Sequence, residues 1–268
     1  MNILYNKESI KFYLTWKEGF ALAATPKFRT QKTAFYVLIT YIICQLSSFL
    51  LILIPGFKES LLNLISTGDE KQKLIMLSAW WTTISFAIAF FVSYALILRD
   101  KQFWNVYKGE KASIGATIGW GIIGFFLVLL GQSVGAMIET ALGITETSEN
   151  TEAIMDITRI APIMILATVF FGPILEELVF RRVLFGSLIQ IYNFWISGFV
   201  SAIFFAAIHF DFTHILLYTI TGFVFAFLYH KTKRLLTSII AHMLLNGFVT
   251  YVQLNIDKLQ QISDSIPK

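Results

Sequence analysis

The chain has 268 residues, of which 56% are hydrophobic and only 14% are charged, and 26 are phenylalanine. Soluble domains contain about 25% charged residues, so the composition excludes an ordinary soluble protein and predicts an all-α, polytopic membrane protein. The net charge of +4 matters less than where the charges lie, so it does not indicate binding to nucleic acid. The lipid bilayer is the predicted environment.

The first 32 residues form a cytoplasmic or interfacial segment. Their charged residues interrupt any apolar core, whereas a signal peptide needs a continuous apolar run of about 7–15 residues. Apolar residues alternate with lysines there, which predicts a helix lying at the membrane surface; they are Ile10, Phe12, Leu14, Trp16 and Phe20.

About seven transmembrane helices follow, since a span needs about 20 mainly apolar residues. The predicted spans are residues 33–54, 74–98, 114–138, 160–191, 194–210, 212–229 and 235–254. No polar linker divides them, so we expect one domain in four parts. These are the N-terminal segment (1–32), three helices with their loops (33–159), a core of four helices (160–255) and a polar tail (256–268).

Three features of the spans carry structural expectations. The fourth span is too long for one perpendicular crossing, and Gly172-Pro173 is expected to bend or break it. The pairs Gly115/Gly119 and Gly131/Gly135 in the third span favour close helix packing. Cys44 lies inside the first span and is expected to be a packed apolar residue rather than a reactive thiol.

The loops predict the orientation. Fifteen of the 21 lysines and arginines fall on one side if the N-terminus is cytoplasmic, and the acidic residues 139–159, expected to be a loop with the polar tip 147–151, fall on the other. Because cytoplasmic loops are enriched in Lys and Arg, we expect a cytoplasmic N-terminus, an external C-terminus and a location in a bacterial plasma membrane.

One polar stretch lies at membrane depth in the fourth span, where ionisable residues are costly and usually functional. Glu177 and Arg181 are four residues apart and can pair on one helix face, while Glu176 points about 100° away. An unpaired, desolvated carboxylate suits a general base working near neutral pH. The alternative is a structural ion-pair cluster formed with Arg182 at the cytoplasmic interface.

The later spans add two histidines and an amide. His209 follows Phe205 by four residues, and His242 precedes Asn246 by four, so each pair shares a helix face. Helix–helix hydrogen bonding is the alternative for both. His214 and His230, at the ends of the sixth span, are expected to be non-catalytic interface residues.

Taken together, these groups can activate water and stabilise an oxyanion during amide hydrolysis. The sequence contains no His-Glu-x-x-His, which argues against a zincin-type metalloprotease.

The three motifs, in this order on successive spans, resemble those of the CPBP family of intramembrane proteases, named for CAAX proteases and bacteriocin-processing or immunity enzymes. The motifs are Glu176-Glu177-x-x-x-Arg181, Phe205-x-x-x-His209 and His242-x-x-x-Asn246. The resemblance covers about residues 160–255. Many relatives have Asp at the position of Asn246, whereas the type II CAAX prenyl endopeptidase resembles the Asn version.

The resemblance implies a role for each matching position. Glu176 would activate the hydrolytic water, Glu177 would assist it with Arg181 in support, and Asn246 would complete the oxyanion site. His209 and His242 would hold the water or polarise the scissile carbonyl. The family is often labelled metalloprotease, and if a metal such as Zn²⁺ is used, Glu176, His209 and His242 are its expected ligands.

The simple seven-span arrangement does not place these residues at one depth. His209 would lie near the outer end of its span, and Glu176 nearer the inner end of its own. Either the helix that carries Glu176 starts at Pro173 and is offset, or the boundaries near residues 186–196 are wrong. We favour the boundary error, with a fifth helix that begins inside the membrane.

The leading hypothesis is an intramembrane endopeptidase that cleaves a membrane-associated or lipid-linked peptide. A non-enzymatic bacteriocin self-immunity or scaffold protein is the first alternative. A small transporter that relays protons through Glu176 and Glu177 is the second, although such transporters commonly contain inverted repeats and this chain has none.

Overall fold

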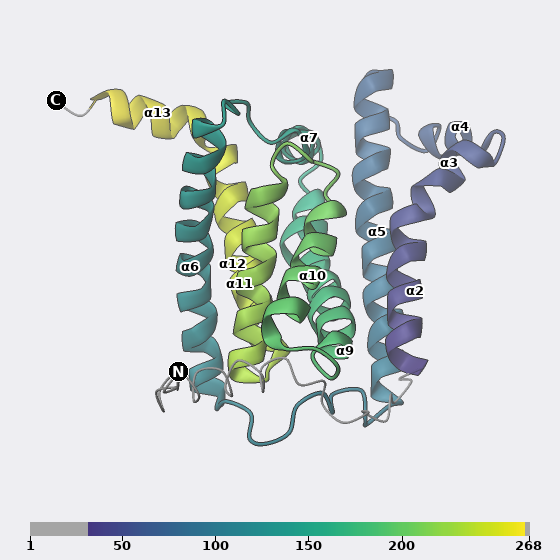
Figure 1. The fold of residues 1–268 in the computed structure, drawn as a ribbon. Helices are drawn as coiled ribbons and strands as arrows, with labels where there is room; N and C mark the ends of the chain where they lie inside the picture. Colours follow the sequence, from purple (N-terminus) through teal and green to yellow (C-terminus); the bar gives the residue numbers. More distant parts are fainter. Residues whose placement is uncertain (1–31, 266–268) are drawn as a thin grey trace, which may run out of the picture.

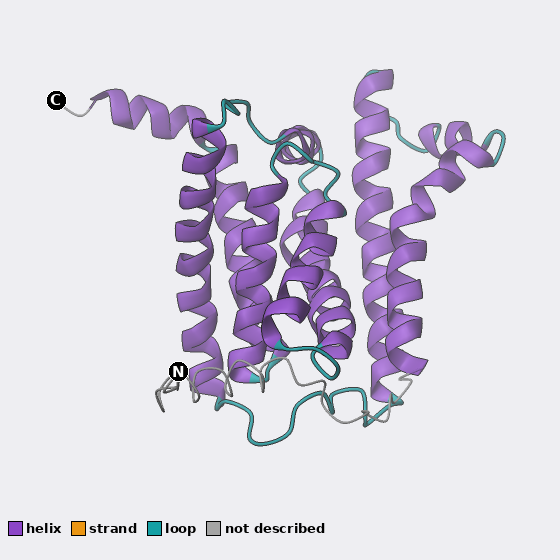
Figure 2. Ribbon diagram, in the orientation of Figure 1, coloured by secondary structure: helices purple, strands orange, loops and turns teal. Residues whose placement is uncertain are grey.

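The structure is a computed structural model that describes residues 32–265, and this range contains only helices and loops (Figure 2). The predicted interfacial helix within residues 1–32 lies almost entirely outside the described residues. The all-α fold class is confirmed for the part of the chain that is described.

Among residues 32–265, five helices are long and apolar enough to cross a membrane, which confirms a polytopic membrane protein. The first combines α2 (Lys32–Leu46), η1 (Ser47–Phe49) and α3 (Leu50–Leu53). The other four are α5 (Glu70–Leu98), α6 (Ile114–Ala141), α11 (Ile215–Thr232) and α12 (Leu235–Leu254). They run side by side in Figure 1, joined by the shorter apolar helix α10 (Phe194–Ala207).

A continuous helical segment, residues 166–188, replaces the predicted fourth span. It consists of η2 (Leu166–Phe171), α8 (Gly172–Glu176), η3 (Glu177–Phe185) and α9 (Gly186–Leu188). Phe171 and Gly172 keep helical backbone angles, so the helix does not break at Gly172-Pro173, and of the predicted bend or break only the bend stays a prediction. Instead η2 and η3 are π-helical, with wider turns of the kind often found at functional sites.

The acidic region was wrongly predicted as a loop. Glu139 belongs to α6 and is buried, and residues 149–160 form the helix α7 (Glu149–Ile160), capped by the Ser148 side chain. A side-chain oxygen that accepts from the first turn is a common helix start. In Figure 1 α7 is seen end-on, so it lies across the long helices rather than along them.

The two ends of the helix bundle differ in charge. The end that holds α7 and α13 (Ile256–Ser265) is called the acidic end, and the short α4 (Phe57–Leu62) also lies there (Figure 1). The loop 99–113 and the turn 233–234 lie at the opposite end, called the basic end. The helix directions therefore bring two of the predicted basic loops, 99–113 and 233–234, to the same end of the bundle.

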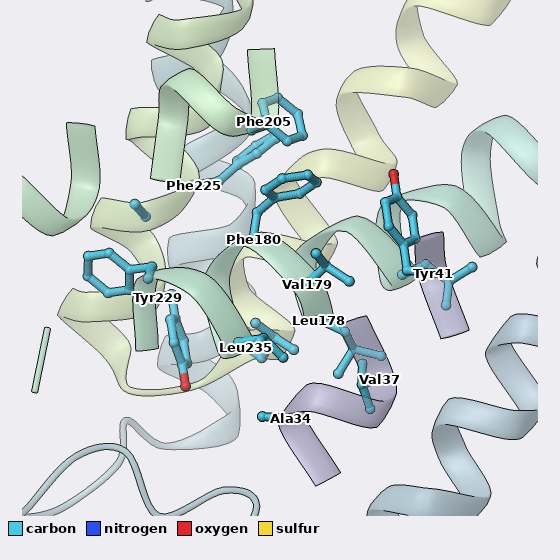
Figure 3. Packing of buried hydrophobic residues seen from close by; sticks show 14 of the residues in the cluster. Ala34, Val37, Tyr41, Leu178, Val179, Phe180, Phe205, Phe225, Tyr229 and Leu235 are labelled. Atoms are coloured by element: carbon cyan, nitrogen blue, oxygen red, sulfur yellow. The ribbon is translucent and has the colours of Figure 1, made fainter. Parts of the chain in front are cut away.

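Aromatic side chains fill the core between the 166–188 segment and helices α10 and α11. Phe180, Phe205 and Phe225 pack edge to face, with ring centroids 5.6 and 6.2 Å apart, and Figure 3 shows them in one column. Tyr41 of α2 packs against Phe180 at 6.2 Å, which joins the first long helix to the core.

Only one of the two predicted glycine pairs packs closely. A Cβ on Gly131 or Gly135 would lie 2.6–2.7 Å from side chains of α11, whereas Gly115 and Gly119 face open space. Cys44 is buried, as expected.

Candidate active site

The two adjacent glutamates occupy different environments. The Glu177 side chain is completely buried, and its Oε2 lies 3.2 Å from Nε of Arg181, which is also completely buried. The Glu176 side chain retains 15% exposure. The predicted pairing of Glu177 with Arg181 is therefore present. The prediction assumed an α-helix, in which Glu176 and Glu177 point about 100° apart, whereas the residues from Glu177 onward form the π-helical η3.

Arg181 is held among aromatic rings rather than in water. Its guanidinium lies 4.2 Å from the ring centroid of Phe205 and 5.1 Å from that of Phe225. One of its N–H groups also points toward the Gly222 carbonyl of α11, at 3.4 Å. A buried charge needs such partners because an unpaired one costs several kcal/mol, on the order of 3–5.

His242 connects the two glutamates. Its Nδ1 lies 3.0 Å from Oε1 of Glu177, and its Nε2 lies 3.7 Å from Oε2 of Glu176. The imidazole stacks on Phe225, with centroids 4.7 Å apart. Since a carboxylate accepts hydrogen bonds, Nδ1 of His242 donates to Glu177, and Nε2 is the nitrogen that faces Glu176.

His209 lies in the turn that directly follows α10. Its Nδ1 lies 2.8 Å from the Phe205 carbonyl, which can only accept, so Nδ1 carries the proton. In a neutral imidazole Nε2 is then a hydrogen-bond acceptor. The rings of His209 and His242 both contact Phe205, at 4.9 and 5.7 Å.

Asn246 makes a helix–helix hydrogen bond. Its amide donates to the Thr168 carbonyl in the π-helical η2, at 2.8 Å. An amide nitrogen carries two donor hydrogens, so this bond leaves one for another acceptor. The alternative role considered for Asn246 on sequence grounds is thus part of what this residue does.

A cavity of about 680 Å³ brings the predicted residues together. Glu176, His209, His242 and Asn246 all line it, whereas Glu177 and Arg181 lie behind its wall. Apolar residues of α2, α5 and α7 form much of the remaining lining. Of the two carboxylates, Glu176 is therefore the one that a molecule in this cavity could reach.

The structure also explains the depth mismatch differently from our expectation. The helix α10 begins at residue 194, as predicted, so the start of the fifth span is not the error. It ends at residue 207, and Figure 1 shows that α10 and α11 both stop short of the acidic-end termini of α5 and α6. His209 lines the cavity together with residues of α7.

The described residues do not form a metal site as they are arranged. No group of three or more His, Cys, Asp or Glu side chains among residues 32–265 is placed to hold a metal ion. Nδ1 of His209 lies against a backbone carbonyl and Nδ1 of His242 against Glu177, which leaves Nε2 of each ring as the nitrogen that a metal would use. The expected ligand set Glu176, His209 and His242 stays a prediction.

A second polar cluster, not predicted from the sequence, lies beside His209. The Tyr218 ring stacks on His209 with centroids 4.1 Å apart. Its hydroxyl lies 3.1 Å from the Ser148 hydroxyl and accepts from the Asn150 amide at 3.2 Å. Ser148 also donates to Asp211 at 2.7 Å. These contacts fix the start of α7 above the cavity, and only the position of Tyr218 one turn after His214 hinted at them.

The predicted interface residue His214 is a buried member of this cluster. Its Nδ1 lies 2.8 Å from Oε2 of Glu139 in α6, and both side chains are less than a tenth exposed. Burial acts to lower the pKa of His214, but the hydrogen bond to Glu139 and the charges of Asp211 and Glu139 outweigh it and raise the pKa above its ordinary value. The pair ties the end of α6 to the start of α11.

A helical membrane fold with a cavity lined by Glu, His and Asn side chains is typical of the intramembrane proteases. The sequence profile of the Type II CAAX prenyl endopeptidase Rce1-like family matches residues 158–248, a range that contains Glu176, His209, His242 and Asn246 of the cavity lining. The chain belongs to this Rce1-like type II CAAX prenyl endopeptidase (CPBP) family of membrane proteases.

Two bacterial relatives are similar over most of their length. The "Putative membrane peptidase YdiL" of Bacillus subtilis is 42% identical over 227 residues, which cover 84% of this chain and 90% of the relative. The "Membrane-embedded CAAX protease MroQ" of Staphylococcus aureus is 36% identical over 224 residues, covering 81% and 88%. No solved structure matches the chain significantly.

Proposed function

We propose that this protein is an intramembrane endopeptidase that hydrolyses a peptide bond of a membrane-associated or lipid-linked peptide with a water molecule activated by Glu176. The observation that carries the proposal is the division of the two carboxylates. Glu176 lines the cavity, and Glu177 is buried behind it in an ion pair with Arg181.

Glu176 is the proposed general base. Its carboxylate accepts a proton from water, and the water oxygen attacks the carbonyl carbon of the scissile bond. A general base contributes about 10²–10⁴-fold to rate when it lies within hydrogen-bond reach of the proton that it removes. Nε2 of His209 is an acceptor in the neutral ring, so it is suited to orient the same water.

The attack places negative charge on the carbonyl oxygen, and Asn246 is the proposed donor to it. Preorganised donors aimed at a developing oxyanion contribute strongly to catalysis. The Glu176 carboxylic acid then returns its proton to the departing nitrogen. The carbon–nitrogen bond breaks, and the products are a carboxylic acid and an amine.

Glu177, Arg181 and His242 are proposed as the support of this base. Arg181 neutralises Glu177, and Glu177 orients His242, whose Nε2 faces Glu176 at 3.7 Å. Groups that act through another group in this way fix the ring position and tautomer of the histidine. Glu177 therefore assists catalysis without contacting the substrate.

The substrate and topology follow from the lining and the helix directions. The cavity is lined by apolar and polar residues together, so it suits an extended peptide whose backbone meets the polar groups and whose apolar or lipid-linked segment meets the apolar ones. We propose that the 166–188 segment and α10 complete seven crossings. The N-terminus and the basic end would then be cytoplasmic, in accordance with the distribution of Lys and Arg.

The proposal is tested by cleavage in proteoliposomes. The full chain is reconstituted and supplied with a fluorogenic peptide library, in unmodified and prenylated forms. Glu176→Gln keeps the size of the side chain and removes the base, so we expect about a 10²–10⁴-fold loss of cleavage rate.

Glu110→Gln is the matched control, because Glu110 is an exposed residue at the basic end. Equal cleavage by wild type and Glu176→Gln would refute the mechanism. It would leave a structural role for the cluster, as in a scaffold or self-immunity protein, as the better account.

A further inference from the structure

A second groove opens at the basic end, on the side of the 166–188 segment that faces away from the cavity with Glu176. It has a volume of about 460 Å³ and lies between α5, the 166–188 segment, α12 and the end of α11. It shares no lining residue with the cavity that holds Glu176. The proposed peptidase function makes no use of it.

The body of this groove is apolar and large enough for an acyl chain. Seven aliphatic residues and one phenylalanine line this body, namely Phe90, Ile97, Leu98, Ile174, Leu178, Leu235, Leu236 and Ile239. Figure 3 shows Leu178 and Leu235 close to Tyr229, which also lines the groove. Burying apolar surface of this kind contributes about 0.8 kcal/mol per methylene group.

Three cations line the mouth of the groove: Lys111, Lys233 and Arg234. Two of them, Lys233 and Arg234, are held in place by hydrogen bonds from their side chains to backbone carbonyls of the loop 99–113. Lys233 adopts a left-handed backbone (φ 54°) and donates from Nζ to the Lys108 carbonyl at 3.0 Å. Arg234 donates from Nε to the Ala112 carbonyl. Lysine has three donor hydrogens and arginine five, so both retain donors for an anion.

Other groups at the mouth agree with a lipid headgroup. The side chains of Tyr94 and Trp104 line it and are 54% and 39% exposed, and Trp and Tyr are the residues enriched at membrane interfaces. The acidic residues of the same loop are Asp100 and Glu110, and Asp100 accepts from the Gln102 backbone. The cations around the mouth outnumber these two acids.

We propose that this groove binds one anionic phospholipid from the leaflet at the basic end. One acyl chain would occupy the apolar body, and the phosphate would lie between Lys111, Lys233 and Arg234. Clusters of basic residues beside a transmembrane helix attract anionic lipids. Ile174 and Leu178 belong to the helix that carries Glu176 and Glu177, so the bound chain would pack against the back of that helix.

Native mass spectrometry of the purified full chain in detergent tests the proposal. Phosphatidylglycerol and phosphatidylcholine with the same acyl chains are added separately, and we expect one phosphatidylglycerol to be retained per chain in preference to phosphatidylcholine. Each cation near a membrane surface contributes about fivefold to affinity. The triple variant Lys111→Gln, Lys233→Gln and Arg234→Gln should therefore weaken retention about a hundredfold.

Two further variants keep the test decisive. The control triple Lys58→Gln, Lys71→Gln and Lys73→Gln removes the same charge away from the groove and should retain phosphatidylglycerol. Leu236→Trp fills the groove from a position that is 45% exposed, leaves the cations intact and should displace the lipid. Equal retention of the two lipids, equal loss in both triple variants, or full retention by Leu236→Trp would each overturn the proposal.

Discussion

Two neighbouring carboxylates acquire different environments because one side chain turns toward a guanidinium and the other toward a cavity. Glu177 is fully buried against Arg181, and Glu176 keeps partial access. This is a recurrent arrangement in acid–base sites, where environments separate the roles of two like groups. At the residue scale, the proposed mechanism depends on this division.

Tyr218 provides a test of how the site is held. Its ring stacks on His209, and its hydroxyl contacts Ser148 and Asn150. We expect Tyr218→Leu to lower kcat for peptide cleavage about tenfold to a hundredfold with little change in KM. The reason is that a small displacement of a positioned group is costly, while the substrate still binds. Tyr218→Phe keeps the ring and should retain most activity.

Steady-state kinetics in proteoliposomes measures both parameters. Tyr251→Leu is the matched control, since Tyr251 is 64% exposed on α12 and exposed substitutions have small effects. If Tyr218→Phe lost as much activity as Tyr218→Leu, the stacked ring would not be what positions His209.

At the element scale, the 166–188 segment and α7 carry the features that most affect the site. The π-helical turns on both sides of Gly172-Pro173 set the direction of Glu176, Glu177 and Arg181. The helix α7 lies over the cavity and is fixed by contacts with the start of α11. Neither element is a straight α-helical span, because the 166–188 segment contains π-helical turns and α7 lies across the long helices.

The connection between α6 and α11 makes a pH-dependent contribution to stability. The pKa of His214 is raised above its ordinary value of about 6.5. The stabilisation is therefore fully present below about pH 6.5 and is lost as pH rises through the folded-state pKa. We expect His214→Gln to cost about 1.5–3 kcal/mol at low pH, the range for hydrogen bonds to charged groups, and less at high pH.

Thermal unfolding of the detergent-solubilised chain between pH 5.5 and 9 measures this difference. Glu139→Gln removes the partner and should reproduce the effect, and the double variant should add little to either single change. A difference between wild type and His214→Gln that stayed constant or grew with pH would contradict this assignment.

At the scale of the whole molecule, the helix directions bring the basic loops to one end and the acidic helix α7 to the other (Figure 1). This arrangement agrees with the tendency of Lys and Arg to remain on the cytoplasmic side. It also places the groove that we assign to an anionic lipid at the basic end.

The orientation can be tested by cysteine labelling, because Cys44 is buried and contributes little background. We expect Glu146→Cys to react with a membrane-impermeant maleimide on intact bacterial cells, and Lys108→Cys to react only after lysis. Both positions are exposed loop residues, so they are matched in access. The opposite labelling pattern would contradict this topology and place the basic end outside the cell.

Much of this arrangement could be predicted from composition and spacing. Apolar runs of about 20 residues have few alternatives to a transmembrane helix, since lipid leaves no other partner for the backbone. For this reason the spans that became α5, α6 and α12 were predicted within a few residues of their observed bounds. The helix α7 was missed because its charged, short sequence resembles a loop unless its cap and its packing partners are known.

The sequence by itself determined that the chain is a polytopic helical membrane protein, and it identified Glu176, Glu177, His209, His242 and Asn246 as the polar residues to explain. The tertiary structure decided which carboxylate is paired, since burial and ion-pair distance depend on side chains from other helices. It also decided the depth of His209 and the place of α7, because these follow from where α10 stops and what covers it. Local spacing fixes neighbours on one helix face, whereas the cavity is formed by residues far apart in the chain.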